Sequence, residues 1–323
     1  MLAHTSSKAK PAALRPGDKV GIVAPASPVE RVAFEAGCAH LRRLGHEAVF
    51  SPSIFDCDLF FAGSAERRAR ELEEMFERDD VKAILCARGG YGCNYLLGKL
   101  NPDRIRKHPK IFVGYSDLTT LHTWLLDQVG LVVFHGPMLA KDFADDSGVD
   151  QMSWDAAISG ASGWKPDTRA TKTLMAGEAE GILYGGCLSL LAASLGTPYE
   201  IKTEGTILFL EDVNTKPFQI DRMLMQLRFA GKFKGVRGIV FGEMLDCIQP
   251  GNQNYTLEEV VKRALGDFRI PVAFGLRSGH VSSANITLPL GVKSKLTAGD
   301  RVELTILESA TAPAAQAKTR HAR

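Results

Sequence analysis

The sequence contains no apolar run long enough to cross a membrane and no C-x-x-C pair among its six cysteines. A transmembrane helix needs about 20 mostly apolar residues, whereas the first apolar run, 20–24, stops at Pro25. Residues 1–13 show no secretory signal. We therefore expect a cytoplasmic protein with reduced thiols and no membrane partner. The sequence does not decide whether Cys86 and Cys93 form a disulfide, and nothing in it requires one.

The chain also lacks an excess of one charge. It has 39 Lys and Arg against 37 Asp and Glu, a formal net charge of +2, and its one basic cluster is the end of the chain, 318–323. Proteins that bind nucleic acid carry a basic patch or stripe, so we expect no nucleic-acid partner. The 323 residues, 45% of them hydrophobic, are enough for two domains with a buried core.

In the first half of the chain, short apolar runs alternate with helical patterns. Strands are expected at 19–24, 47–50, 81–87, 111–113 and 132–135, and helices at 28–44, 65–78, after Gly92 and from Asp117 to Gln128. This alternation predicts an α/β fold, here a doubly wound parallel sheet. Such sheets bind ligands at the carboxyl ends of their strands.

The second half predicts a mixed α/β domain with antiparallel character. Strands are expected at 206–210, 238–241, 272–275, 286–288 and 301–307, and helices at 188–195, 220–229 and 257–265. Residues 141–178 are rich in Asp, Ser, Gly and Thr and predict an inter-domain connection. The expected domains are thus 14–140 and 179–308, with disordered tails at 1–13 and 309–323.

Ser116 is the most informative residue, because it stands where an apolar strand ends at Gly114 and a helical pattern begins after Asp117. A serine on such a turn exposes its Oγ beside unpaired N–H groups of a helix N-terminus. Acyl transfer needs both an exposed nucleophile and oxyanion donors. A plain helix cap is the alternative, and the motif taken alone favours it.

A serine nucleophile needs a base and an acid that orients the base. Eight histidines compete; His135 ends a strand, and His280 lies in a loop of small residues that would let it reach across a cleft. Glu211 and Asp212 end the strand at 206–210, where a carboxylate is held rigidly. The alternative is that these two carboxylates cap the turn or pair with Arg222.

A glycine-rich segment, Arg88-Gly89-Gly90-Tyr91-Gly92, follows the strand at 81–87. It lacks the G-x-G-x-x-G spacing of a dinucleotide site, so phosphate binding has little support. Gly90 could instead offer its N–H as a second oxyanion donor, or the segment could be a plain tight turn.

Six short motifs occur together and in order: 87–92, 114–117, 135–138, 209–213, 220–224, and 279–280 with 285–291. In combination they resemble the LD-carboxypeptidase family, the muramoyl-tetrapeptide carboxypeptidases, over residues 14 to 307. The resemblance implies a catalytic triad of Ser116 as nucleophile, Glu211 and His280. The N–H groups of Asp117 and Gly90 would bind the oxyanion, and no metal or cofactor is needed.

The resemblance implies a cytoplasmic serine peptidase of peptidoglycan recycling that removes the terminal D-alanine from murein tetrapeptides, and it suggests a homodimer. Arg88 is a candidate for binding the substrate carboxylate, with a structural role as the alternative. The chain departs from the family pattern at Cys187, where Asn is common, and near Thr215, where an acidic residue is frequent. Both departures could alter substrate preference.

Two other functions stay open. One is a microcin-immunity-type serine peptidase that acts on a peptidyl-nucleotide antibiotic; the short region between Glu243 and His280 favours the recycling enzyme over it. The other is a non-hydrolytic nucleotide-binding α/β protein. The sequence leaves open whether the third residue of the peptide substrate is diaminopimelate or lysine.

Overall fold

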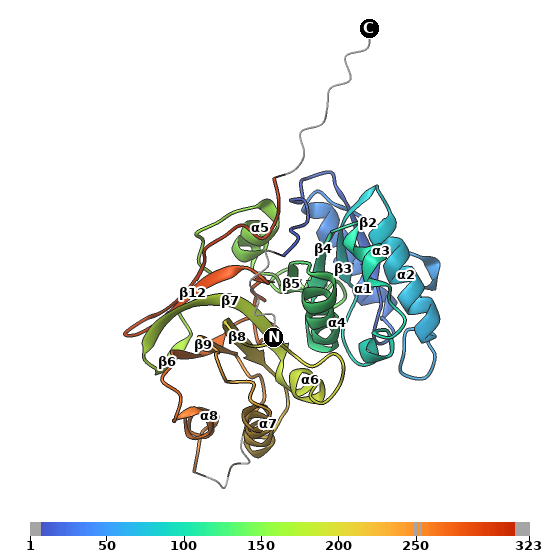
Figure 1. Cartoon of the computed structure of the whole chain (residues 1–323). Helices are drawn as coiled ribbons and strands as arrows, with labels where there is room; N and C mark the ends of the chain where they lie inside the picture. Colours follow the sequence, from blue (N-terminus) through green and yellow to red (C-terminus); the bar gives the residue numbers. More distant parts are fainter. Residues whose placement is uncertain (1–7, 249–250, 252–253, 314–323) are drawn as a thin grey trace.

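Two sheets with their helices make up the molecule in the computed structural model (Figure 1), which describes residues 8–248, 251 and 254–313. Within these residues the first sheet has six strands in the order β11-β5-β4-β3-β1-β2. All neighbours in it are parallel except β11, which runs antiparallel to β5. The strands are β1 Lys19–Val23, β2 Glu47–Val49, β3 Val81–Cys86, β4 Ile111–Gly114, β5 Val133–His135 and β11 Leu288–Leu290.

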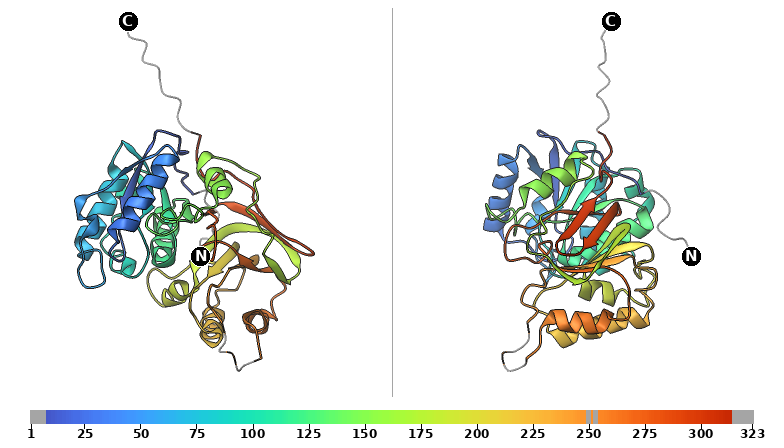
Figure 2. Two further views of the ribbon diagram at one scale, coloured as in Figure 1. Left: turned by 180° about the vertical axis from the view of Figure 1, so that it is seen from behind. Right: turned by 90° about the vertical axis from the view of Figure 1, so that its left-hand side faces the viewer.

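The second sheet is mixed and curls beneath the first (Figure 2). Among the described residues it has seven strands in the order β13-β12-β7-β8-β9-β10-β6, with β7 to β10 parallel and the outer pairings antiparallel. The strands are β6 Lys172–Met175, β7 Gly177–Cys187, β8 Thr206–Glu211, β9 Gly238–Gly242, β10 Val272–Leu276, β12 Lys293–Ala298 and β13 Val302–Ile306. The expected α/β fold, with a parallel first sheet and a mixed second one, is confirmed.

Helices form where apolar residues recur on one face. Helix α2 begins after Ser64, whose Oγ accepts from Arg67 N, and it buries Leu72 and Phe76 on the face that packs against the first sheet. Helix α4 packs against both β5 and β7 and so lies between the two sheets. The helices are α1 Arg31–Arg43, α2 Ala65–Glu77, α3 Pro102–Arg106, α4 Thr119–Trp124, α5 Gln151–Ser159, α6 Leu188–Ala193, α7 Pro217–Phe229 and α8 Leu257–Leu265.

The helical segment after Ser116 differs from the single helix expected. It starts with a 3₁₀ turn, η3 (Ser116–Leu118), continues as α4, and ends in a π-helical turn, η4 (Leu125–Val129), that stops at Gly130. The helix expected after Gly92 is a short 3₁₀ turn, η2 (Cys93–Tyr95), followed by α3.

The segment 141–178, expected to be a connection, contains regular structure. Asp150 caps α5 by accepting from Ser153 N at 2.9 Å, and β6 pairs with β10 at an edge of the second sheet. The helix was missed because its apolar residues do not form one clear helical face, although Trp154 and Ile158 are buried.

The C-terminal half of the chain also contributes a strand to the first sheet. The strand expected at 286–288 in the C-terminal domain is β11, which joins the first sheet beside β5. Strand β12 was not expected at all, and it links β7 to β13. The first sheet therefore includes a segment from the C-terminal half of the chain.

Parts of the expected tails are bonded to the folded body. Ala9 N donates to Gly130 O at 2.7 Å, and Ala13 N donates to Ala312 O at 3.1 Å. Residues 8–13 and 309–313 are therefore structured, a correction to the sequence analysis. Residues 1–7 and 314–323 lie outside the described residues.

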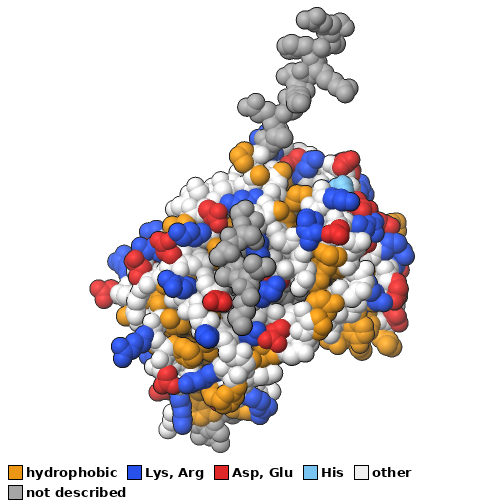
Figure 3. Space-filling view, viewed as in Figure 1, with side chains coloured by type: hydrophobic (Ala, Val, Ile, Leu, Met, Phe, Trp, Pro, Cys, Tyr) orange, Lys and Arg blue, Asp and Glu red, His pale blue; other side chains and the backbone are white. Residues whose placement is uncertain are grey.

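The surface and the thiols agree with the composition. Figure 3 shows basic and acidic side chains interspersed over one face, as a net charge of +2 predicts. All six cysteines are described and are free thiols, so Cys86 and Cys93 are not joined. None of the helices in the described ranges has the length and apolar character of a membrane span.

Candidate active site

Ser116 lies directly after β4, at the start of η3. Its φ is +65°, a left-handed conformation that non-glycine residues seldom adopt and that recurs at functional turns. The residues around it are buried, whereas Ser116 itself is only half-buried. The turn therefore directs the hydroxyl away from the core, as the sequence analysis expects for a nucleophile elbow.

Gly89, in the loop after β3, packs directly against this serine. A Cβ at Gly89 would lie 2.8 Å from Ser116 Cβ and 3.0 Å from Ser116 Oγ, distances that real contacts avoid. The next residue, Gly90, has a φ of +113° and lies against Ser27. Glycine at 89 thus lets the loop come close enough to place Gly90 beside the serine.

Glu211 and His280 form a hydrogen-bonded pair. Glu211 ends β8, is fully buried, and its Oε2 accepts from His280 Nδ1 at 2.7 Å and from His280 N at 3.1 Å. Gly279, with a φ of +94°, lies so close that a Cβ there would be 2.7 Å from Glu211 Oε2. The hydrogen bond from His280 Nδ1 to Glu211 fixes the His280 tautomer with the proton on Nδ1, which leaves Nε2 free to accept a proton.

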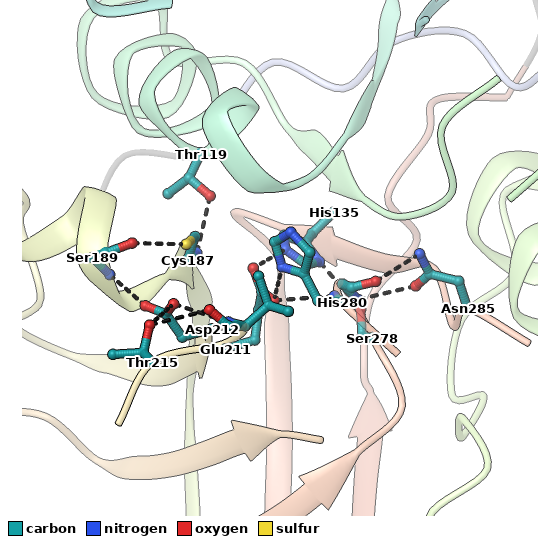
Figure 4. Close-up of polar contacts among 12 residues, drawn as sticks. Thr119, His135, Cys187, Ser189, Glu211, Asp212, Thr215, Ser278, His280 and Asn285 are labelled. Atoms are coloured by element: carbon teal, nitrogen blue, oxygen red, sulfur yellow. Dashed lines mark hydrogen bonds and ion pairs between the residues drawn. The ribbon is translucent and has the colours of Figure 1, made fainter. Parts of the chain in front are cut away.

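A second histidine approaches the other carboxylate oxygen (Figure 4). His135 Nε2 lies 3.8 Å from Glu211 Oε1, and both side chains have no exposed surface. Burial alone would raise the pKa of Glu211, but the contacts with His135 and His280 outweigh it and lower the pKa to about 2. Glu211 is therefore ionised at neutral pH despite its complete burial.

Ser116 and His280 line one cleft of about 400 Å³ beyond the carboxyl ends of β3, β4 and β5. The His280 side chain is 12% exposed, and its ring packs edge-on against Tyr115, with ring centroids 5.0 Å apart. In the described residues no hydrogen bond joins Ser116 Oγ to His280; catalytic contacts in ligand-free enzymes are commonly long. The lining residues are Val29, Glu30, Arg88, Gly89, Gly90, Tyr115, Ser116, Met138, Ala140, Lys141 and His280.

Two cations line this cleft. Arg88 is exposed, and its guanidinium donates to Pro28 O at 3.3 Å; it forms no ion pair with any described residue. Lys141 is also exposed, with its Nζ 5.6 Å from the centre of the Tyr115 ring. Sequence analysis places Lys141 in the inter-domain connection and so misses it; its position six residues after His135 was the available signal.

Asp117 and Asp212 have structural bonds. The Asp117 carboxylate is buried and accepts from Cys93 N at 2.8 Å, so its backbone, and not its side chain, remains the candidate oxyanion donor. Asp212 accepts from Ser189 N at 2.9 Å and from Thr215 Oγ1 at 2.8 Å. Of the two carboxylates at the end of β8, the structure thus brings Glu211 to the histidine.

Cys187 and Thr215, the two positions where the chain departs from the family pattern, lie near Glu211 and Asp212 (Figure 4). Cys187 ends β7, and its N donates to Thr119 Oγ1 at 2.9 Å across the contact between the sheets. Burial raises the pKa of the Cys187 thiol well above its usual value, so it stays neutral. Among the described residues no cluster of three or more His, Cys, Asp or Glu could hold a metal ion.

Residues 20–136 match the N-terminal domain of LD-carboxypeptidases, and residues 180–296 match the C-terminal domain. The chain belongs to the LD-carboxypeptidase family. It is a serine-type carboxypeptidase, a hydrolase, as the sequence motifs indicate. Both matched regions contribute to the cleft described above, the first with Ser116 and the second with His280.

Two relatives match most of the chain. The chain is 38% identical over 300 residues to a probable murein peptide carboxypeptidase of Bacillus subtilis, covering 90% of this chain and 92% of that one. It is 29% identical over 317 residues to the microcin C7 self-immunity protein MccF of Escherichia coli, covering 87% and 91%.

Solved structures share the fold. The muramoyltetrapeptide carboxypeptidase of Oxalobacter formigenes superposes with a TM-score of 0.79 at 28% identity, covering 90% of this chain and 99% of that one. MccF in complex with glutamyl sulfamoyl guanosine superposes with a TM-score of 0.86 at 25% identity, covering 94% and 99%.

Proposed function

We propose that this LD-carboxypeptidase removes the terminal D-alanine from murein tetrapeptides, with Ser116, His280 and Glu211 as its catalytic triad. One observation carries the proposal: a buried carboxylate holds a histidine that shares a cleft with a serine in a strained turn. The resemblance to murein peptide carboxypeptidases supplies the substrate class.

The chemistry starts with attack of Ser116 Oγ on the carbonyl carbon that precedes the D-alanine. His280 Nε2 takes the hydroxyl proton, and the Glu211 carboxylate stabilises the imidazolium that results. The tetrahedral intermediate collapses when His280 gives this proton to the D-alanine nitrogen, which breaks the peptide bond and leaves an acyl-enzyme on Ser116. Water, deprotonated by His280, then releases the shortened peptide.

The oxyanion of each intermediate needs fixed donors. The N–H of Asp117, directly after the nucleophile, and the N–H of Gly90, on the loop held against Ser116, are the donors we assign. Arg88 and Lys141 are the cations in the cleft that can pair with the substrate's terminal carboxylate. A carboxypeptidase needs such a cation because its substrate ends in a free carboxylate.

We further expect the enzyme to act in the cytoplasm as a homodimer. The six free thiols support a reducing compartment, and the family resemblance supports the dimer, which light scattering of the purified protein would test.

The test uses matched tetrapeptides that end in D-Ala or L-Ala, with chromatography of the products. Inverting the terminal Cα leaves either its methyl group or its carboxylate misplaced. Loss of a charged hydrogen bond to that carboxylate costs about 1.5–3 kcal/mol, so we expect at least about tenfold preference for D-Ala. Equal rates on the two peptides would contradict the proposal.

A serine-directed fluorophosphonate label, applied to the wild type and to Ser116→Ala, is the companion measurement. Labelling without cleavage of either peptide would favour an antibiotic substrate like the ligand bound to MccF. No labelling of the wild-type protein would remove Ser116 from the mechanism and would favour a non-hydrolytic protein.

A further inference from the structure

His135 is a buried histidine that the triad does not use. It ends β5, and its Nε2 faces Glu211 Oε1 at 3.8 Å, on the side of the carboxylate away from the His280 bond. Neither of these two atoms has a hydrogen-bond partner among the described residues, and neither side chain is exposed. Unpaired polar atoms in a protein interior are costly, so this contact needs an explanation.

The position of one proton on His135 follows from its other contact. Ser278 Oγ donates its single hydrogen to Ile286 O at 2.8 Å. At the 3.2 Å contact between His135 Nδ1 and Ser278 Oγ, the ring must therefore be the donor. A neutral His135 would then turn the lone pair of Nε2 toward an anionic carboxylate oxygen, which is repulsive. An imidazolium would turn an N–H toward it.

The surrounding groups leave Glu211 as the charge that His135 faces. The titratable side chains packed around His135 are Glu211 on β8, His122 on α4 and Tyr115 after β4, with His280 beyond the carboxylate. Burial lowers the pKa of His122 and raises that of Tyr115, so both are neutral. Phe209 covers another side of the ring.

Burying a carboxylate is costly unless its oxygens are paired or hydrogen-bonded, and Glu211 Oε1 has no hydrogen bond among the described residues, so a cation facing it would offset this cost. His280 cannot be this cation, since a general base must be neutral before it takes the serine proton. We propose that His135 is a positioning residue: an imidazolium whose Nε2–H points to Glu211 Oε1 and compensates its charge. This keeps His280 neutral at working pH. The proposal rests on the proposed function only for the role of His280.

The protonation state can be read directly from ring-nitrogen NMR of the wild-type protein labelled with [¹⁵N]histidine. We expect both His135 nitrogens to carry protons at neutral pH, whereas His280 shows the neutral Nδ1–H form. Assignment uses His135→Gln, or single substitutions of the other histidines if that variant does not fold. A neutral His135 at pH 7 overturns the proposal, whatever the substrate of the enzyme is.

The pH–rate profile gives a second readout. His135→Gln keeps an N–H donor without the charge, and His135→Phe removes both. In either variant the uncompensated Glu211 holds a proton on His280 more tightly, so the acid limb of kcat/KM moves up by about one pH unit. At pH values below the acid limb, kcat/KM of each variant should be about tenfold lower than that of the wild type, and at pH values above the limb it should change little.

His122→Phe is the matched control, because His122 is equally buried and its ring centroid lies only 6.2 Å from that of His135, yet it does not contact Glu211. Its acid limb should stay in place. A uniform loss of activity at all pH values in the His135 variants, with an unmoved limb, would mean a merely structural role. If Ser116→Ala retains full activity, the proposed triad fails, while the NMR result still decides the state of His135.

Discussion

Gly89→Ala tests whether the serine is held in place by the glycine loop. The added methyl group would lie 2.8 Å from Ser116 Cβ and 3.0 Å from Ser116 Oγ. Gly89 does not have a positive φ, so alanine itself causes no backbone strain there. The effect of the substitution therefore comes from the collision with the serine.

The size of the effect follows from the displacement. Ordinary contact begins near 3.4 Å, so Ser116 and residue 89 must separate by about 0.6 Å. Catalytic groups tolerate about 0.5 Å of misplacement, and 1 Å can cost about 100-fold in rate. We expect kcat/KM on the D-Ala tetrapeptide to fall about 10- to 100-fold, with about 1–3 kcal/mol of destabilisation from overpacking.

The assay compares D-alanine release, fluorophosphonate labelling and thermal unfolding for the wild type, Gly89→Ala and Gly98→Ala. Gly98 is the matched control, since its nearest heavy atom to an added Cβ is Tyr199 Oη at 3.9 Å. Gly98→Ala should keep wild-type turnover. If Gly89→Ala stays folded and turns over within about twofold of wild type, the serine is not confined as the contact distances indicate.

Three further predictions follow from the buried polar groups. Glu211→Gln should fold but lose about 10³–10⁴-fold in kcat, because the imidazolium is no longer stabilised; turnover near the wild-type rate would remove Glu211 from the mechanism. The pKa of Glu211 is about 2 when folded, below the usual value of 4.5, so its contribution to the free energy of unfolding is complete above pH 4.5 and is lost as the pH falls toward 2. In denaturant titrations, the stability difference between wild type and Glu211→Gln should therefore narrow over that window; a constant difference would contradict the assignment. Arg68→Lys should cost about 2–4 kcal/mol, because the buried guanidinium donates to Pro25 O, Gly63 O and Gly92 O, whereas exposed Arg70→Lys should change stability by less than about 0.5 kcal/mol.

Local sequence signals located the main elements. The apolar run before Ser116 and the helical pattern after it placed the serine at a strand end, and β4 and η3 meet there. Helix α8 begins and ends at the residues expected, since its apolar positions recur with helical spacing. In contrast, α5 was missed because its apolar residues do not recur clearly on one helical face.

The sequence alone determined many of the strands and helices, the turn at Ser116 and, through its motifs, the family. Tertiary structure decided that Lys141 enters the cleft and that His135 faces Glu211. The physical reason is that periodicity and turn chemistry act over a few residues. The contact between positions 135 and 211 instead depends on how two sheets pack across α4, which no local pattern encodes.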